Sequence, residues 1–146
     1  MLYYIHNKNS LEDNMNINLN NLATKAKNEN NWDQETWLQA KQEYIRFLTL
    51  RQKYPDETLV PSDLMDGVWH VHILNTRQYI SDCDALFGKY LHHVPHLDEG
   101  ISEENKEKFA STLSLYEREF GEPMIYSSAA RCNGKPCHVP SNCRCR

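Results

Sequence analysis

The chain has 146 residues, the size of a single domain with one hydrophobic core. Apolar residues make up 40% and charged residues 25%, a composition typical of globular proteins that excludes collagen-like and wholly disordered chains. The net charge of -4 gives no overall electrostatic reason to bind nucleic acid or an anionic membrane. No apolar run reaches the roughly 20 residues of a membrane span, so we expect a cytoplasmic protein without a membrane partner.

The N-terminal segment, residues 1–31, contains ten Asn and few apolar residues at helical spacing. We expect it to form a flexible arm. The next segment, residues 32–123, is expected to be a helical domain. Its first helix begins near Trp32, carries apolar residues at steps of three and four, and ends before Pro55.

A second helix is predicted from Asp63 to Phe87. Ser62 is placed as its N-cap, and Gly88 is in the position of a glycine that ends a helix. Its apolar stripe continues without a turn signal, which favours one helix over a strand. A strand over Gly67–Leu74 is the alternative, since several β-branched residues and a tryptophan occur there.

A third helix is predicted from Ser102, its N-cap, to Phe120, with Gly121 and Pro123 ending it. The remaining residues, 124–146, show no periodicity. The sequence therefore predicts an all-α fold, a small single-domain bundle of about three main helices with an irregular, Cys-rich C-terminal tail.

Five of the seven His residues lie between His70 and His96, in and just after the second predicted helix. Asp66 and His70 are four residues apart, so on a helix one side chain lies above the other. A carboxylate and an imidazole so placed can bind one metal ion or hold each other by a hydrogen bond. His92 and His93 follow a short turn, and the chain could fold back to bring one or both to this pair.

On a regular helix the side chains of His70 and His72 point in directions about 160° apart, so the two imidazoles cannot bind one ion. On a strand the two imidazoles would instead share one face and form a chelate. The alternative interpretation is that His72 is a core histidine with a backbone partner and that His92 and His93 are solvated. Trp69, Tyr79 and Tyr90 are interpreted as core residues, and Asp82 and Asp84 as a solvated face.

The candidate metal ligands are Asp66, His70, His72, His92 and His93. Their N and O atoms suit a divalent transition metal, with zinc as the first expectation and copper or iron as alternatives. Three ligands with an open position would fit a catalytic metal, and four a structural one. The sequence contains no phosphate-binding loop, no G-x-S-x-G and no H-E-x-x-H.

The tail offers a second set of possible ligands, which comprises Cys132, Cys137, His138, Cys143 and Cys145. These residues could bind zinc or cuprous copper, or form disulfides in an oxidising compartment. Their spacing matches no standard zinc finger. A disordered basic tail is the alternative.

The run from Asp66 to Cys83, with D-x-x-W-H-x-H, a Tyr and a D-C pair, is followed by Phe87-Gly88 and Leu91-His92-His93. This pattern resembles the glycine-rich-domain-containing-protein-like family, and the similarity extends from about Trp32 to Pro123. Plant members carry appended Gly-rich segments and are linked to development and stress responses. This chain lacks such a segment and ends in the Cys cluster instead. The resemblance assigns the site to Asp66, His70, His72 and His92 or His93.

Three functions remain open from the sequence. The first is a metal-binding helical domain with an Asp/His site, whether or not it is an enzyme, acting on an unknown small molecule or protein. The second is a non-catalytic protein-interaction module, in which the same residues form a structural polar network. Nucleic-acid binding through the basic tail ranks last.

Overall fold

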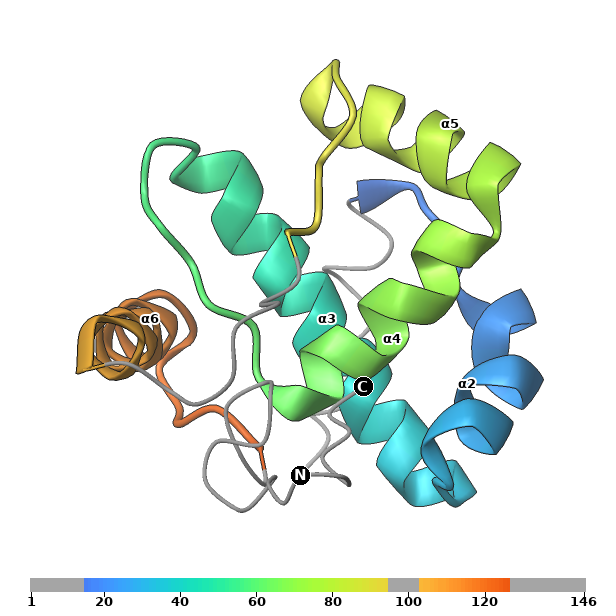
Figure 1. Cartoon of the computed structure of the whole chain (residues 1–146), viewed down its shortest axis with the longest axis horizontal. Coiled ribbons are helices and arrows are strands. Elements are labelled where there is room, and N and C mark those ends of the chain that lie inside the picture. Colours follow the sequence, from blue (N-terminus) through green and yellow to red (C-terminus); the bar gives the residue numbers. More distant parts are fainter. Residues whose placement is uncertain (1–14, 95–102, 127–146) are drawn as a thin grey trace.

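The computed structural model describes residues 15–94 and 103–126 (Figure 1). Within these ranges the chain forms helices and no strand, which confirms the all-α expectation and rejects a strand over Gly67–Leu74. The elements are η1 (Asn20–Leu22), α2 (Ala23–Asn30), α3 (Gln34–Lys53), α4 (Asp63–Leu74), α5 (Thr76–Phe87) and α6 (Glu103–Phe120). No helix in the described ranges is long and apolar enough to cross a membrane.

Helix α3 is the central element, and α4 packs across it with α2 and α6 on either side (Figure 1). Its N-cap is Asp33, whose side chain accepts a hydrogen bond from the Thr36 amide at 2.8 Å, and its C-cap is Tyr54, before Pro55. Its buried face includes Trp37, Tyr44 and Phe47. The first predicted helix is therefore confirmed, because a strong apolar stripe and clear end signals coincide.

Residues 15–31 differ from the flexible arm that the sequence indicated. They form η1 and α2, and the side chains of Leu19, Leu22 and Ala26 are almost fully buried. Few apolar residues are enough here because each of them is inserted into the core beside α3 and α4. Residues 1–14 lie outside the described ranges.

The second predicted helix is in fact two helices, and the expectation of one continuous helix is wrong. The chain turns at Asn75, whose φ of -87° and ψ of 74° are not helical. The Asn75 side chain donates to Gln78 at 2.9 Å and thereby stabilises the first turn of α5. Because of this turn, α5 packs back toward α4 and buries Tyr79 and Cys83. The predicted ends of the segment are confirmed, with Ser62 capping α4 and Gly88 ending α5 at a φ of 69°.

Helix α6 confirms the third predicted helix and is joined to the rest of the fold through polar contacts. The Tyr116 hydroxyl donates to the buried Glu43 carboxylate of α3 at 2.6 Å. At the C-terminal end of α3, the Tyr54 hydroxyl donates to Glu119 at 2.9 Å. The Thr112 hydroxyl accepts from the amide of Val60, in the connection that leads to α4. Ser102, its predicted N-cap, lies outside the described ranges.

Candidate metal centre

The first turns of α4 place Asp66 and His70 on one face. The Asp66 side chain is 8% exposed and the His70 side chain 37% exposed. Asp66 Oδ1 lies 3.5 Å from His70 Nε2, which agrees with the vertical alignment of residues four apart on a helix. The carboxylate is therefore inside the protein, while the imidazole beside it reaches solvent.

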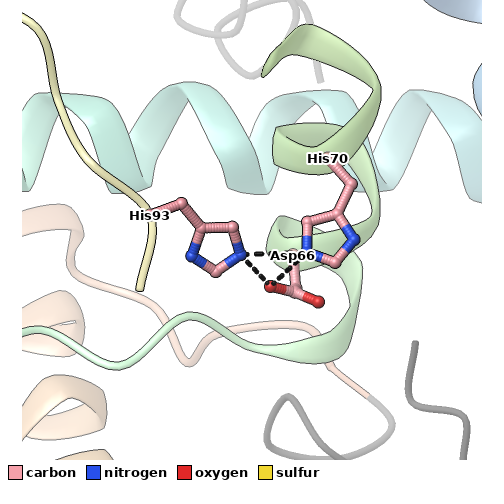
Figure 2. Close-up of side chains that lie close together, drawn as sticks. All are labelled: Asp66, His70 and His93. Atoms are coloured by element: carbon pink, nitrogen blue, oxygen red, sulfur yellow. Dashed lines mark hydrogen bonds and ion pairs between the residues drawn. The ribbon is translucent and has the colours of Figure 1, made fainter. Parts of the chain in front are cut away.

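His93 joins this pair from the segment that follows α5. Its Nε2 atom lies 2.7 Å from Asp66 Oδ1 and 3.0 Å from His70 Nε2. Figure 2 shows both imidazoles turning a nitrogen toward the same carboxylate oxygen. Three possible ligand atoms from two separate segments thus converge on one point, and we name Asp66, His70 and His93 the Asp/His triad.

The spacing of the triad fits a small metal ion. Zinc lies about 2.0–2.1 Å from its N and O ligands, so tetrahedral ligand atoms are about 3.3 Å apart. The triad distances of 2.7, 3.0 and 3.5 Å lie on both sides of this value, so small shifts of the side chains would accommodate the ion. Hydrogen bonds alone do not account for all of these contacts.

Trp69 holds His93 in its place beside Asp66 and His70. Its indole stacks on His93, with ring centroids 4.0 Å apart and planes 12° apart. The indole nitrogen donates to the Tyr79 hydroxyl at 2.9 Å, and that hydroxyl donates to the Leu91 carbonyl at 2.5 Å. The segment that carries His93 is therefore held by α4 through stacking and by α5 through a hydrogen bond. Such outer contacts orient metal ligands and raise affinity.

A cavity of about 460 Å³ borders the triad. Asp66 and His93 belong both to the triad and to the wall of the cavity. The wall also includes the apolar side chains of Phe47 and Trp69. This volume lies within the usual range of small-molecule pockets, which combine apolar walls with a few polar groups.

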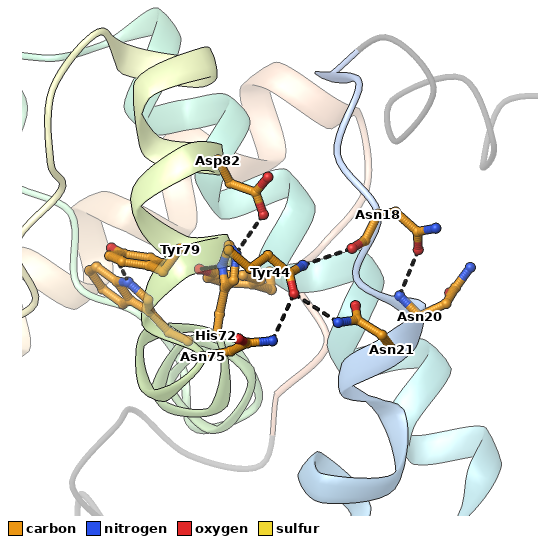
Figure 3. A network of polar contacts seen from close by, with 10 residues as sticks. Asn18, Asn20, Asn21, Tyr44, His72, Asn75, Tyr79 and Asp82 are labelled. Atoms are coloured by element: carbon orange, nitrogen blue, oxygen red, sulfur yellow. Dashed lines mark hydrogen bonds and ion pairs between the residues drawn. The ribbon is translucent and has the colours of Figure 1, made fainter.

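His72 lies in a different network from His70. Its Nδ1 atom lies 2.8 Å from the Tyr44 hydroxyl and its Nε2 atom 2.8 Å from Asp82 Oδ2 (Figure 3). Burial lowers the pKa of His72, although the hydrogen bond to Asp82 acts in the opposite direction. A neutral ring satisfies both contacts if Tyr44 donates to Nδ1 and Nε2–H donates to the carboxylate. His72 is therefore a core histidine, with side-chain partners in place of the expected backbone carbonyl.

The expectation that Asp82 lies on a solvated face is also wrong. That placement assumed one continuous helix, whereas the turn at Asn75 directs this part of α5 toward His72. The sequence contained a signal for the turn, since Asn often competes with helical hydrogen bonds through its side chain. Tyr44 and the role of the Tyr79 hydroxyl were also missed, because contacts between distant helices leave no local pattern.

The other candidate ligands fall outside the triad. His92 is next to His93, but its ring packs against Tyr90 at a centroid distance of 4.7 Å. Tyr90 itself is 41% exposed, so its assignment to the core is wrong, whereas Trp69 and Tyr79 are buried as expected. The tail set and His96 lie outside the described residues. That set is Cys132, Cys137, His138, Cys143 and Cys145.

A family model described as UCP032817-like matches residues 10–114, which is most of the chain and includes the whole triad. No curated protein and no solved structure matches the chain. The match thus names a family other than the glycine-rich-domain one that the motifs resemble.

Proposed function

We propose that this chain, which belongs to the UCP032817-like family, is a metal-binding domain whose Asp/His triad holds one divalent transition metal ion. The observation that carries the proposal is the mutual approach of three ligand atoms, with distances of 2.7, 3.0 and 3.5 Å. Two imidazoles and one carboxylate are a donor set used for zinc and for non-haem iron. Zinc is our first choice, because two His and one carboxylate are the protein ligands of several catalytic zinc sites.

Three protein ligands leave room for a further ligand on the ion. Catalytic zinc sites keep such a position for water or substrate, while structural sites fill all four positions with protein atoms. The exposure of His70 and the adjacent cavity both provide access to this position. An ion there would lower the pKa of a bound water or polarise a bound oxygen. The resemblance to the glycine-rich-domain family is compatible with this proposal, since its motif contains Asp66, His70 and either His92 or His93.

The test is the metal content of the untagged full-length protein. Cys132, Cys137, Cys143 and Cys145 are changed to Ser in every sample, so that tail thiols do not contribute. After growth with zinc, copper and iron, elemental analysis should find about one ion per chain. His70→Gln and His93→Gln should each lose most of it.

His92→Gln is the matched control, because it removes an imidazole next to His93 from outside the triad. It should keep the metal content of the parent. Retention of metal by folded His70→Gln and His93→Gln proteins would refute the proposed ligands, and so would an equal loss in His92→Gln.

The alternative function is an interaction module with a structural polar network. The direct contact of 2.7 Å between His93 and Asp66 favours it, because this is the length of a charge-assisted hydrogen bond. Under this alternative, the parent protein contains no metal and His93→Gln lowers its thermal stability. Elemental analysis and a thermal melt on the same samples separate the two functions.

A further inference from the structure

The cavity beside the Asp/His triad contains an arginine with unusual partners. The Arg51 side chain donates from Nη1 to the Glu57 carbonyl at 2.7 Å and from Nη2 to the Pro55 carbonyl at 3.5 Å. Both acceptors are backbone atoms in the loop after α3, and they hold the guanidinium in place at the cavity wall. In the described part of the chain, no carboxylate pairs with it.

The other cations near this region have counter-charges. Lys108, which also lines the cavity, forms an ion pair with Glu104 at 2.8 Å. Arg46, which precedes Arg51 on α3, forms an ion pair with Glu122 at 2.6 Å. Arg51 therefore differs from both, since its positive charge is fixed by neutral acceptors. A guanidinium has five N–H donors, and the two carbonyls leave most of them for a ligand.

The rest of the wall determines what else the ligand must contain. Phe47, Leu59 and Trp69 provide an apolar surface. Asp56 and Glu57 also line the cavity, but both residues are exposed. The contact of Glu57 to Arg51 is made by its backbone carbonyl. The wall thus combines the Arg51 guanidinium, which has no carboxylate partner among the described residues, and the ion-paired Lys108 with an apolar face beside the Asp/His triad.

We propose that this cavity binds a small amphipathic carboxylate, with its carboxylate on Arg51 and its apolar body against Phe47 and Trp69. This inference deepens the proposed function by naming the substrate class of the same site, and it rests on that function only for the chemistry at the metal. Planar carboxylates suit arginine because two parallel N–H groups can bind both oxygens. Binding to Arg51 itself does not require the ion.

The experiment is calorimetric titration of sodium hexanoate into zinc-treated, full-length protein. Hexan-1-ol, with the same apolar chain and no charge, is titrated in parallel. We expect saturable hexanoate binding that Arg51→Gln weakens about ten-fold or more, which is the loss of one charge-assisted contact. Arg51→Gln should leave hexanol binding unchanged.

Arg118→Gln is the matched control, because Arg118 is an exposed cation of α6 outside the cavity wall. It should bind hexanoate like the parent. The inference is overturned if hexanoate does not bind, if hexanol binds equally well, or if Arg51→Gln binds hexanoate as the parent does. Metal content, measured on the same samples, tells a failure of this inference from a failure of the metal site.

Discussion

The imidazole of His93 lies flat on the indole of Trp69, with ring centroids 4.0 Å apart and planes 12° apart. Trp69 stands three residues after Asp66 and one before His70, so a single turn of α4 presents two triad residues and the surface that orients the third. This arrangement explains why a tryptophan belongs with the Asp and His of the motif. It also connects the triad to α5, through the bond from Trp69 to Tyr79.

Tyr79→Phe tests whether α5 supports the triad. The change removes the hydroxyl that accepts from Trp69 and donates to the Leu91 carbonyl. We expect metal affinity to fall by about 10-fold, the low end of the effect of losing a direct contact to a metal ligand, because the hydroxyl acts on His93 through Trp69 and Leu91. Chelator competition measures the affinity. Tyr54→Phe is the control. It also removes a tyrosine hydroxyl that donates a hydrogen bond, but its acceptor is Glu119 of α6, outside the triad.

The two variants should differ clearly. Equal affinities for Tyr79→Phe and the parent, in protein with unchanged circular dichroism, would show that the hydroxyl does not position His93. An equal loss in Tyr54→Phe would show a general effect of the substitution instead.

Gly67→Ala tests the close approach of α2 to α4. An added Cβ would lie 2.6 Å from the Trp32 ring and 2.8 Å from the Asn30 side chain, closer than nonbonded atoms can remain. We expect the free energy of unfolding, measured with urea in the presence of chelator, to fall by about 1–3 kcal/mol. In the Trp32→Leu background the same change should cost less, because the obstructing ring is absent. A Gly67→Ala protein as stable as the parent would contradict this packing.

The pH dependence of stability tests the buried network of His72. Burial lowers its pKa from the ordinary value of 6.5, so the unfolded chain takes up the proton at a higher pH than the folded one. The neutral ring therefore contributes stability that is complete above pH 6.5 and is lost as the pH falls below it. His72→Gln should be about 1–3 kcal/mol less stable than the parent at high pH, with a smaller difference at low pH.

Urea unfolding in chelator at a series of pH values measures this difference. His92→Gln is the control, since its ring is outside the network, and its difference from the parent should not follow the same course. A difference between His72→Gln and the parent that stays constant or grows toward low pH would contradict the assignment.

Glu43→Gln tests the buried contact between α3 and α6. Burial raises the pKa of Glu43 above 4.5, although the hydrogen bond from Tyr116 and the charge of Arg46 lower it. A raised pKa means that the folded state holds the proton more tightly, so the contribution of this group to stability declines as the pH rises above 4.5. The variant should therefore gain stability relative to the parent over that range. Thermal melts measure it, and exposed Glu107→Gln should show no such gain.

Much of the local structure follows from the sequence. The apolar spacing of α3, the Ser62 cap and the glycine at position 88 all act within a few residues, and each was placed correctly. The approach of Asp66 to His70 is of the same kind, because it depends only on helical geometry. The different surroundings of His70 and His72 also agree with that geometry.

Tertiary structure decided the rest. Neither spacing nor composition distinguishes His92 from His93, since the choice depends on how Trp69 and Tyr79 hold a loop. The turn at Asn75 likewise converts Asp82 from an outward-facing residue into a partner of His72. Residues 15–31 are ordered because the core accepts their few apolar side chains. Periodicity records which face of an element is apolar, whereas the contacts between elements depend on the packing of all of them together.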